Sequence, residues 1–242
     1  MAGIARPGFK ANIKANMDST KGDKLFVNIK PDTTLRVRFL PPAKADGMLF
    51  FVTGQHFKVK NAEGKPCALA DRCIHAGDPS DYLEDLSRVL IKHGDDNEKR
   101  IGQDIRLSKR WNAQVLVAEK EDGEWTYFGP KIISLSKTTA EAVNQILMNQ
   151  DMVGDDHFYD PDMGQDLLIT RKGAGFDTKY SVDRTGLKAS LDDVFPEWSS
   201  KFIADIEDVM GLNIVSLDEQ KAAARRTYPM LDWEALEEDH DL

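Results

Sequence analysis

Apolar and polar residues alternate along several short segments in the first three-quarters of the chain. In segment 33–40, Leu35, Val37 and Phe39 fall on one face of an extended strand. Arg36 and Arg38 fall on the other face. Similar patterns bounded by turn residues predict further strands, at 25–30, 48–60, 104–120, 124–129, 166–173 and 177–182. Their spacing favours antiparallel pairs, so the body of the chain is predicted to be mainly β.

Helical periodicity interrupts this pattern at a few places. In segment 79–93 the apolar residues recur at helical spacing, Ser80 is a suitable cap and Gly94 a suitable stop. A second helix is expected over 137–149, capped by Thr138 or Thr139. Two more helical segments are expected nearer the C-terminus, at 197–211 and 216–226.

The predicted fold class is α+β, mainly β with helical insertions, and the strand count and spacing suit an elaborated Greek-key barrel of the OB type. Other small barrels and β-sandwiches fit the same strands. The expected organisation is a flexible basic arm (1–23), an OB-type core (24–188) with a Cys/His insertion (about 66–104), a C-terminal helical segment (189–230) and an acidic tail (231–242).

Charge is distributed unevenly along the chain. The 242 residues include 32 Lys and Arg against 41 Asp and Glu, a formal net charge of −9, which by itself counts against a nucleic-acid-binding protein. However, residues 1–188 hold 28 basic and 27 acidic side chains, whereas residues 189–242 hold 4 and 14. The acidity therefore belongs to the C-terminal quarter, and the body can carry local positive faces.

The cysteine count and the lengths of the apolar runs indicate in which cellular compartment the protein is expected to function. Only two cysteines occur, which excludes a disulfide scaffold and favours a reducing, cytoplasmic environment. No apolar run approaches the roughly 20 residues that span a bilayer. No membrane association is expected.

Catalytic motifs are scarce. The sequence lacks a phosphate-binding P-loop, a G-x-S-x-G elbow and an H-E-x-x-H helix. Segment 151–166 holds six aspartates, which leaves a metal-dependent nuclease as an alternative. The chain is otherwise expected not to be an enzyme.

Cations lie next to aromatic residues at several positions. In Lys109-Arg110-Trp111-Asn112, strand alternation places Lys109 and Trp111 on one face. Single-stranded DNA binding needs this chemistry, because cations follow the phosphates and flat rings stack on unpaired bases. The residues expected to contact DNA are Arg36, Arg38, Phe57, Lys58, Lys109, Arg110, Trp111, Arg171, Lys172, Phe176, Lys179 and Tyr180.

Four residues form a candidate zinc site with the spacing H-x10-C-x5-C-x-H. They are His56, Cys67, Cys73 and His75. Zinc would crosslink the strand that carries His56 to the polar insertion. Two buried thiols and two surface histidines explain the same residues without a metal.

The ordered series RVRFLPP, GQHFKVK, SKRWNAQVLVAEK, TYFGPKI and DLLITRKGAGFDTKY resembles the single-stranded-DNA-binding proteins of T-even-like bacteriophages, over about residues 25–185. The resemblance implies an elaborated OB fold, with Trp111 and Phe176 against the bases. It places Lys109, Arg110, Arg171 and Lys172 along the groove. It also implies a zinc ion, although the family ends its zinc site with C-x2-C and this chain has Cys73-Ile74-His75.

The expected function is therefore to coat and protect single-stranded DNA, without sequence preference, in phage replication, recombination and repair. By resemblance, the basic arm promotes self-association along the strand. The acidic tail recruits replication and recombination proteins and competes with DNA for the binding groove. The protein is expected to act in the host cytoplasm. The alternative is a non-catalytic protein–protein adaptor with a β-barrel body and an acidic recruitment tail.

Overall fold

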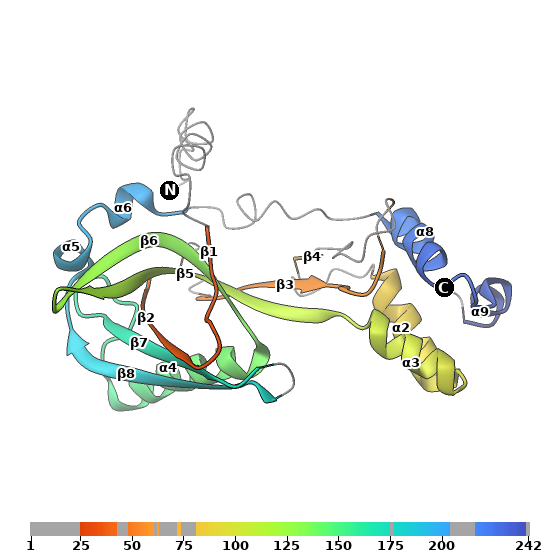
Figure 1. Ribbon diagram of the computed structural model, residues 1–242, viewed down its shortest axis with the longest axis horizontal. Helices are drawn as coiled ribbons and strands as arrows, with labels where there is room; N and C mark the ends of the chain where they lie inside the picture. The colour runs from red at the N-terminus through yellow and green to blue at the C-terminus, as the bar shows by residue number, and fades with distance from the viewer. Residues whose placement is uncertain are drawn as a thin grey trace. The chain divides into compact units, whose positions relative to one another are not determined.

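The computed structural model describes residues 25–42, 48–60, 62, 72–73, 81–174, 177–203 and 216–240. The chain divides into two compact units. The first unit comprises Met1–Pro41, Ala113–Ser134 and Ala142–Phe202, and the second comprises Pro42–Asn112, Leu135–Glu141 and Ile203–Leu242. Figure 1 shows strands and helices in both parts of the chain, so the α+β class is confirmed.

The strands form an open mixed sheet with the order β1-β6-β5-β2-β7-β8, and β3 pairs with β4 and β5. β1 runs parallel to β6, whereas the pairs β2–β5, β2–β7, β3–β4, β3–β5 and β7–β8 are antiparallel. The strands are β1 (Phe26–Val27), β2 (Thr33–Phe39), β3 (Phe51–Gln55), β4 (Arg72–Cys73), β5 (Ser108–Glu121), β6 (Glu124–Leu135), β7 (Gln165–Lys172) and β8 (Lys179–Lys188).

The core of the first unit is built on the apolar face of β2. Val37 pairs with Val117 of β5 and Leu167 of β7, and all three are buried. Phe39 packs edge-on against Phe158 at a centroid distance of 5.3 Å. The predicted alternation in segment 33–40 is thus confirmed.

Two short helices of the first unit cover an apolar cluster on the face of the sheet that carries Arg36 and Arg38. Leu40, Leu116 and Leu191 are buried there, and partly buried aromatic residues pack against them. The helices are α5 (Leu191–Val194) and α6 (Trp198–Lys201). The longer helix α4 (Lys137–Val153) precedes β7 in the chain.

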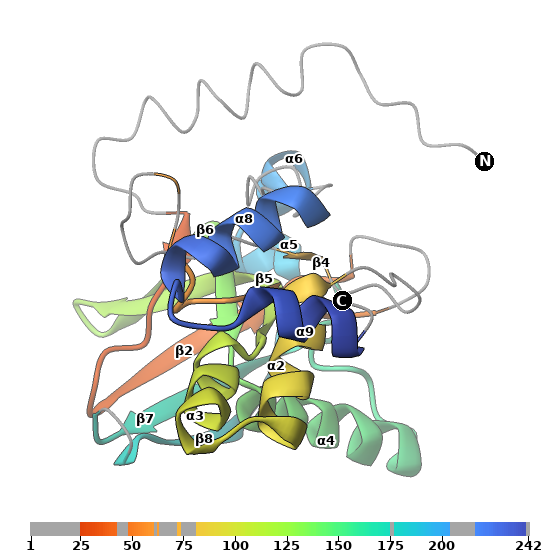
Figure 2. The ribbon, with the colours of Figure 1, turned by 90° about the vertical axis from the view of Figure 1, so that its right-hand side faces the viewer.

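Helices dominate the second unit. α2 (Tyr82–His93) and α3 (Asp96–Ile105) lie side by side, and α8 (Leu217–Thr227) contacts α2 (Figures 1 and 2). A final helix, α9 (Trp233–His240), follows. Their shared core comprises Val59, Tyr82, Leu83, Leu86, Leu90, Ile105, Ala223, Ala224 and Leu231.

Several predicted boundaries were wrong. The first predicted helix begins at Tyr82 and is capped by Asp81, whose side chain accepts a hydrogen bond from the Glu84 N–H, not by Ser80. Helix α3 occupies residues assigned to the irregular insertion and to the start of a strand. It has only two apolar residues, Ile101 and Ile105, so its apolar periodicity was too weak to predict it.

Other differences concern the ends of elements. β6 continues to Leu135, beyond the predicted 124–129. Of the helix predicted over 197–211, the structure describes α6 and no residue from 204 to 211. No helix in the described part of the chain is long and apolar enough to cross a membrane.

Candidate nucleic-acid interface

The β7–β8 hairpin brings most of the predicted cations and rings of the first unit together. Its register places Arg171 opposite Tyr180 and Lys172 opposite Lys179. Both lysines are exposed, and neither has a carboxylate partner among the residues with described positions. Like charges directly opposite each other destabilise a strand pair. A bound phosphate would therefore offset this repulsion.

The end of β7 is fixed by its turn. Gly173 has a φ of 75°, and an added Cβ would lie 2.8 Å from the carbonyl oxygen of Asp177, so only glycine fits without strain. The Gly173 N–H donates to Asp32 Oδ1 at 2.9 Å, which ties this turn to the start of β2. This hydrogen bond anchors the end of β7, which carries Lys172, to the start of β2. Phe176, predicted at its tip, lies outside the described residues.

Arg171 and Tyr180 differ in how accessible their side chains are to a ligand. Arg171 is partly buried and donates from Nη1 to the Ile29 carbonyl oxygen at 2.9 Å. Part of its donor capacity therefore serves the fold. Tyr180 is 37% exposed, so its ring is accessible, on the face of the hairpin opposite to Lys179.

Arg36 and Arg38 converge on one carboxylate instead of facing solvent. Arg38 is 1% exposed and donates from Nε to Asp166 Oδ1 at 2.7 Å and from Nη1 to the Ala189 carbonyl oxygen at 2.8 Å. Arg36 donates from Nε to Asp166 Oδ2 at 2.6 Å. Arg38 therefore offers no surface to a phosphate, and we remove it from the predicted interface.

Tyr127 completes this buried cluster. Its hydroxyl donates to Asp166 Oδ2 at 2.6 Å. Burial, together with the hydrogen bond to Asp166 and the negative charge of that carboxylate, raises the pKa of Tyr127 to about 12. The cluster is a structural junction of β2, β6 and β7 that fixes where Arg36 points.

The Lys109–Asn112 segment lies in the second unit, at the start of β5. Lys109 pairs with Gly54 and Trp111 with Val52 of β3, so the two residues share a face as predicted. Lys109 is exposed, whereas Arg110 and Trp111 are partly buried. Asn112 is fully buried and donates from Nδ2 to the Phe51 carbonyl oxygen at 3.1 Å.

Phe57 and Lys58 follow β3 in the same unit. Phe57 is 43% exposed, so its ring is accessible to solvent. Lys58 is exposed as well, and its Nζ lies 3.5 Å from Asp104 Oδ1. An exposed ion pair of this kind contributes little and can exchange for a phosphate.

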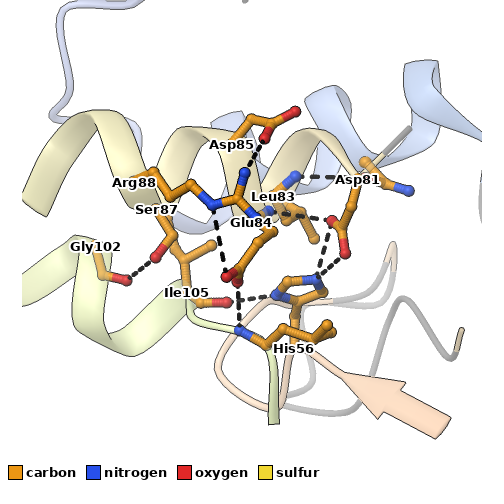
Figure 3. Close-up of polar contacts among 11 residues, drawn as sticks. His56, Asp81, Leu83, Glu84, Asp85, Ser87, Arg88, Gly102 and Ile105 are labelled. Carbon is orange, nitrogen blue, oxygen red and sulfur yellow. Dashed lines mark hydrogen bonds and ion pairs between the residues drawn. The ribbon is translucent and has the colours of Figure 1, made fainter. Parts of the chain in front are cut away.

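His56 is the candidate zinc ligand that the structure describes most fully (Figure 3). It is completely buried, and its Nδ1 donates to the Ile105 carbonyl oxygen at 2.5 Å. Its Nε2 lies 3.2 Å from Asp81 Oδ1. Because Nδ1 is the donor, the Nε2 atom of a neutral His56 ring carries a lone pair and is an acceptor. The Asp81 carboxylate is also an acceptor, so a favourable contact between the two atoms needs a proton or a cation between them.

The other candidate zinc ligands are less well described. Cys67 and His75 lie outside the described residues. The backbone of Cys73 belongs to β4 and pairs with Thr53 of β3, the strand that leads to His56. Among the side chains with described positions, no group of three or more His, Cys, Asp and Glu is suited to hold a metal.

Four of the six aspartates of segment 151–166 lie against basic side chains. Lys188 Nζ lies 2.7 Å from Asp155 Oδ1 and 2.9 Å from Asp156 Oδ2. The hydrogen bond from Lys188 lowers the pKa of Asp155 below its ordinary value. Asp151 contacts His157, and Asp166 belongs to the arginine cluster. These four carboxylates therefore serve contacts within the fold, and Asp155 and Asp156 share Lys188.

The sequence analysis missed Trp125, a residue of β6. Trp125 is 44% exposed, and the Arg36 guanidinium carbon lies 4.2 Å from its ring centroid. Its alternation with Tyr127 within the predicted strand was the available signal, since residues two apart share a strand face.

No protein-family model matches the chain, and a search of curated proteins found no match.

Proposed function

We propose that the protein binds single-stranded DNA without sequence preference, through cations and exposed rings carried by a β body. The observation that carries this proposal is the β7–β8 hairpin, where Lys172 faces Lys179 with no carboxylate described between them and the neighbouring Tyr180 is exposed on the opposite face. Phosphate binding relieves the repulsion, and a ring can stack on any base. Neither interaction reads sequence.

The wider proposal follows from the resemblance. The body is an elaborated OB-type barrel, and the protein coats strands exposed during phage DNA replication, recombination and repair in the host cytoplasm. The arm (1–23) promotes self-association along the strand, and the acidic C-terminal segment recruits replication and recombination proteins. The paired aspartates of segment 151–166 favour this binding role over a nuclease.

An adaptor role has one observation in its favour. Met148, Met152 and Val153, near the C-terminal end of α4, are 63%, 83% and 76% exposed. Exposed apolar side chains this close in sequence are typical of a surface that contacts another protein. Such a contact is compatible with DNA binding elsewhere on the chain.

The hairpin is tested by titrating oligo-dT with the variant Lys172→Gln/Lys179→Gln. We expect wild-type affinity to fall steeply as salt is raised, with weaker binding to duplex DNA. The double variant is expected to bind more weakly and to lose about two units of the slope of log K against log salt, about one per phosphate contact. Fluorescence anisotropy at several salt concentrations measures both.

A matched control is Lys92→Gln/Lys99→Gln, which removes two exposed lysines from α2 and α3. We expect its slope to equal that of the wild type. A wild-type affinity that does not respond to salt, or that is higher for duplex, contradicts the proposal. Loss of the oligonucleotide only when magnesium is present identifies the nuclease.

We also propose one structural zinc ion, held by His56 with Cys67, Cys73 and His75. The Nδ1–H of His56 donates to a backbone carbonyl, the second-shell bond that typically orients a zinc-ligating histidine. Zinc would crosslink β3 to the polar insertion. Protein purified without chelator is expected to contain about one zinc per chain by elemental analysis, and His56→Ala to contain much less. Metal-free wild-type protein contradicts the proposal.

A further inference from the structure

Trp125 is a large aromatic residue on a strand, yet 44% of it is exposed. By contrast, Trp198 packs against the apolar cluster of α5 and α6, and Trp233 packs against the core of the second unit. A tryptophan that served only packing would be covered in the same way. Its ring is therefore accessible for a contact outside the unit.

The orientation of this ring is fixed by a clamped cation. The Arg36 guanidinium carbon lies 4.2 Å from the Trp125 centroid, within the range of a cation–π contact. Asp166 holds Arg36 from the other side through the 2.6 Å bond to Nε, and the Arg36 side chain is only 12% exposed. Because Arg36 is immobilised, Trp125 is held in place before any ligand arrives, which lowers the entropic cost of binding.

The charge around the ring favours a polyanion on this face of the sheet. β5 and β6 are joined by Asp122 and Gly123, with φ of 50° and 94°, which places Lys120 opposite Trp125. Lys120 Nζ lies 6.0 Å from the ring centroid. Glu119 and Glu124, the sequence neighbours of these residues, point to the opposite face by strand alternation.

We propose that Trp125, Arg36 and Lys120 form a further nucleobase-stacking site in the first unit. The indole takes one unpaired base of a single strand, with Arg36 behind the ring and the exposed Lys120 on the neighbouring phosphate. Every base has a π face, so this site is tolerant of sequence. This inference rests on the proposed single-stranded DNA binding and adds a contact that the sequence analysis did not include.

The test compares two strands of equal length and charge, oligo-dT and an abasic strand with the same number of phosphates. Trp125→Ala is expected to bind oligo-dT about 5- to 140-fold more weakly, the loss of one stacked base. Its affinity for the abasic strand and its salt slope should equal those of the wild type, because a ring releases no counterions. Lys120→Gln should instead lower the salt slope by about one.

Two further variants guard against effects on folding. Trp125→Phe keeps a smaller ring and should retain much of the binding, whereas Trp125→Leu keeps apolar volume without a π face and should behave like Trp125→Ala. As a separate control, Met163→Ala removes an exposed apolar side chain from the first unit and should bind as the wild type does.

The outcomes separate the two proposals. If the wild-type protein does not bind oligo-dT, the proposed function fails. If the wild type binds and Trp125→Leu binds equally well, the stacking site is overturned and the proposed function stands. An equal loss on oligo-dT and on the abasic strand also overturns the stacking site, because such a loss does not depend on a base.

Discussion

Replacing Asp166 with asparagine is expected to lower the free energy of unfolding of the first unit by about 3–5 kcal/mol, the usual cost of removing one partner from a buried ion pair. The Asp166 carboxylate accepts from Arg36, from the 1% exposed Arg38 and from Tyr127. Asparagine leaves two guanidinium groups without their counter-charge, one of them fully buried. Urea unfolding measures the change.

Asp183→Asn is the matched control. Asp183 is exposed on β8, directly opposite Leu168, and its replacement should change the free energy of unfolding by less than about 0.5 kcal/mol. Equal stabilities of the wild type and Asp166→Asn would show that the cluster does not stabilise the fold.

Asp166→Asn also has a spectroscopic readout, the absorbance of the Tyr127 phenolate. The pKa of Tyr127 is about 12 because of burial and because Asp166 favours the protonated phenol. Asp166→Asn should therefore lower that pKa, seen as phenolate absorbance at lower pH. In the unfolded wild-type chain the pKa of this tyrosine is about 10, whereas in the folded protein it is about 12. The stability that protonated Tyr127 contributes is therefore complete below pH 10 and is lost as the pH rises to about 12.

Sequence patterns predicted β2, β5 and β7 well because period-two alternation follows directly from strand geometry, whereas β1 and β3 are shorter than predicted and β4 was not predicted. The apolar face of β2 and the pairing of β7 with β8 are examples. Helix α3 was missed because its stability comes from polar caps, including the Asp95–Glu98 capping box, and from packing against α2. Neither gives an apolar periodicity.

The site was only partly predictable for a related reason. Alternation placed Arg36 and Arg38 on the polar face of β2, which is correct, but a polar face need not be a solvent face. Asp166, far away in the sequence, covers that face through a pairing that only the fold creates. The exposure of Trp125 depends on the same tertiary arrangement: its alternation with Tyr127 shows which strand face it shares, but not that this face is open to solvent.

The acidic C-terminal segment carries apolar residues as well as charge. Its composition predicted an acidic tail over 231–242, and within that segment Leu231 is 7% exposed and belongs to the core of the second unit. Trp233 and Leu236 of α9 pack against the same core. The segment combines apolar anchors with carboxylates, and any effect of its charge on DNA has to be separated from its structural role.

Deletion and charge neutralisation of this segment are therefore expected to differ. Deleting residues 231–242 removes the apolar anchors Leu231, Trp233 and Leu236 and should destabilise the second unit by about 2–4 kcal/mol. Full burial of one large apolar side chain contributes about 1.5–3 kcal/mol, and two of these three side chains are only partly buried. The neutralised variant keeps the anchors and Asp232, whose Oδ1 accepts from the Ala235 N–H at the start of α9. Its substitutions are Glu234→Gln, Glu237→Gln, Glu238→Gln, Asp239→Asn and Asp241→Asn.

The neutralised variant should unfold at the same urea concentration as the wild type, because it keeps the apolar contacts. If the carboxylates compete with DNA, its affinity for oligo-dT should rise at low salt. The difference should shrink as salt is raised, because the screening length falls to about 10 Å at 0.1 M. Equal affinities at low salt would mean that the carboxylates do not compete. Higher affinity in the deletion variant alone would then reflect the loss of α9 packing and not the loss of charge.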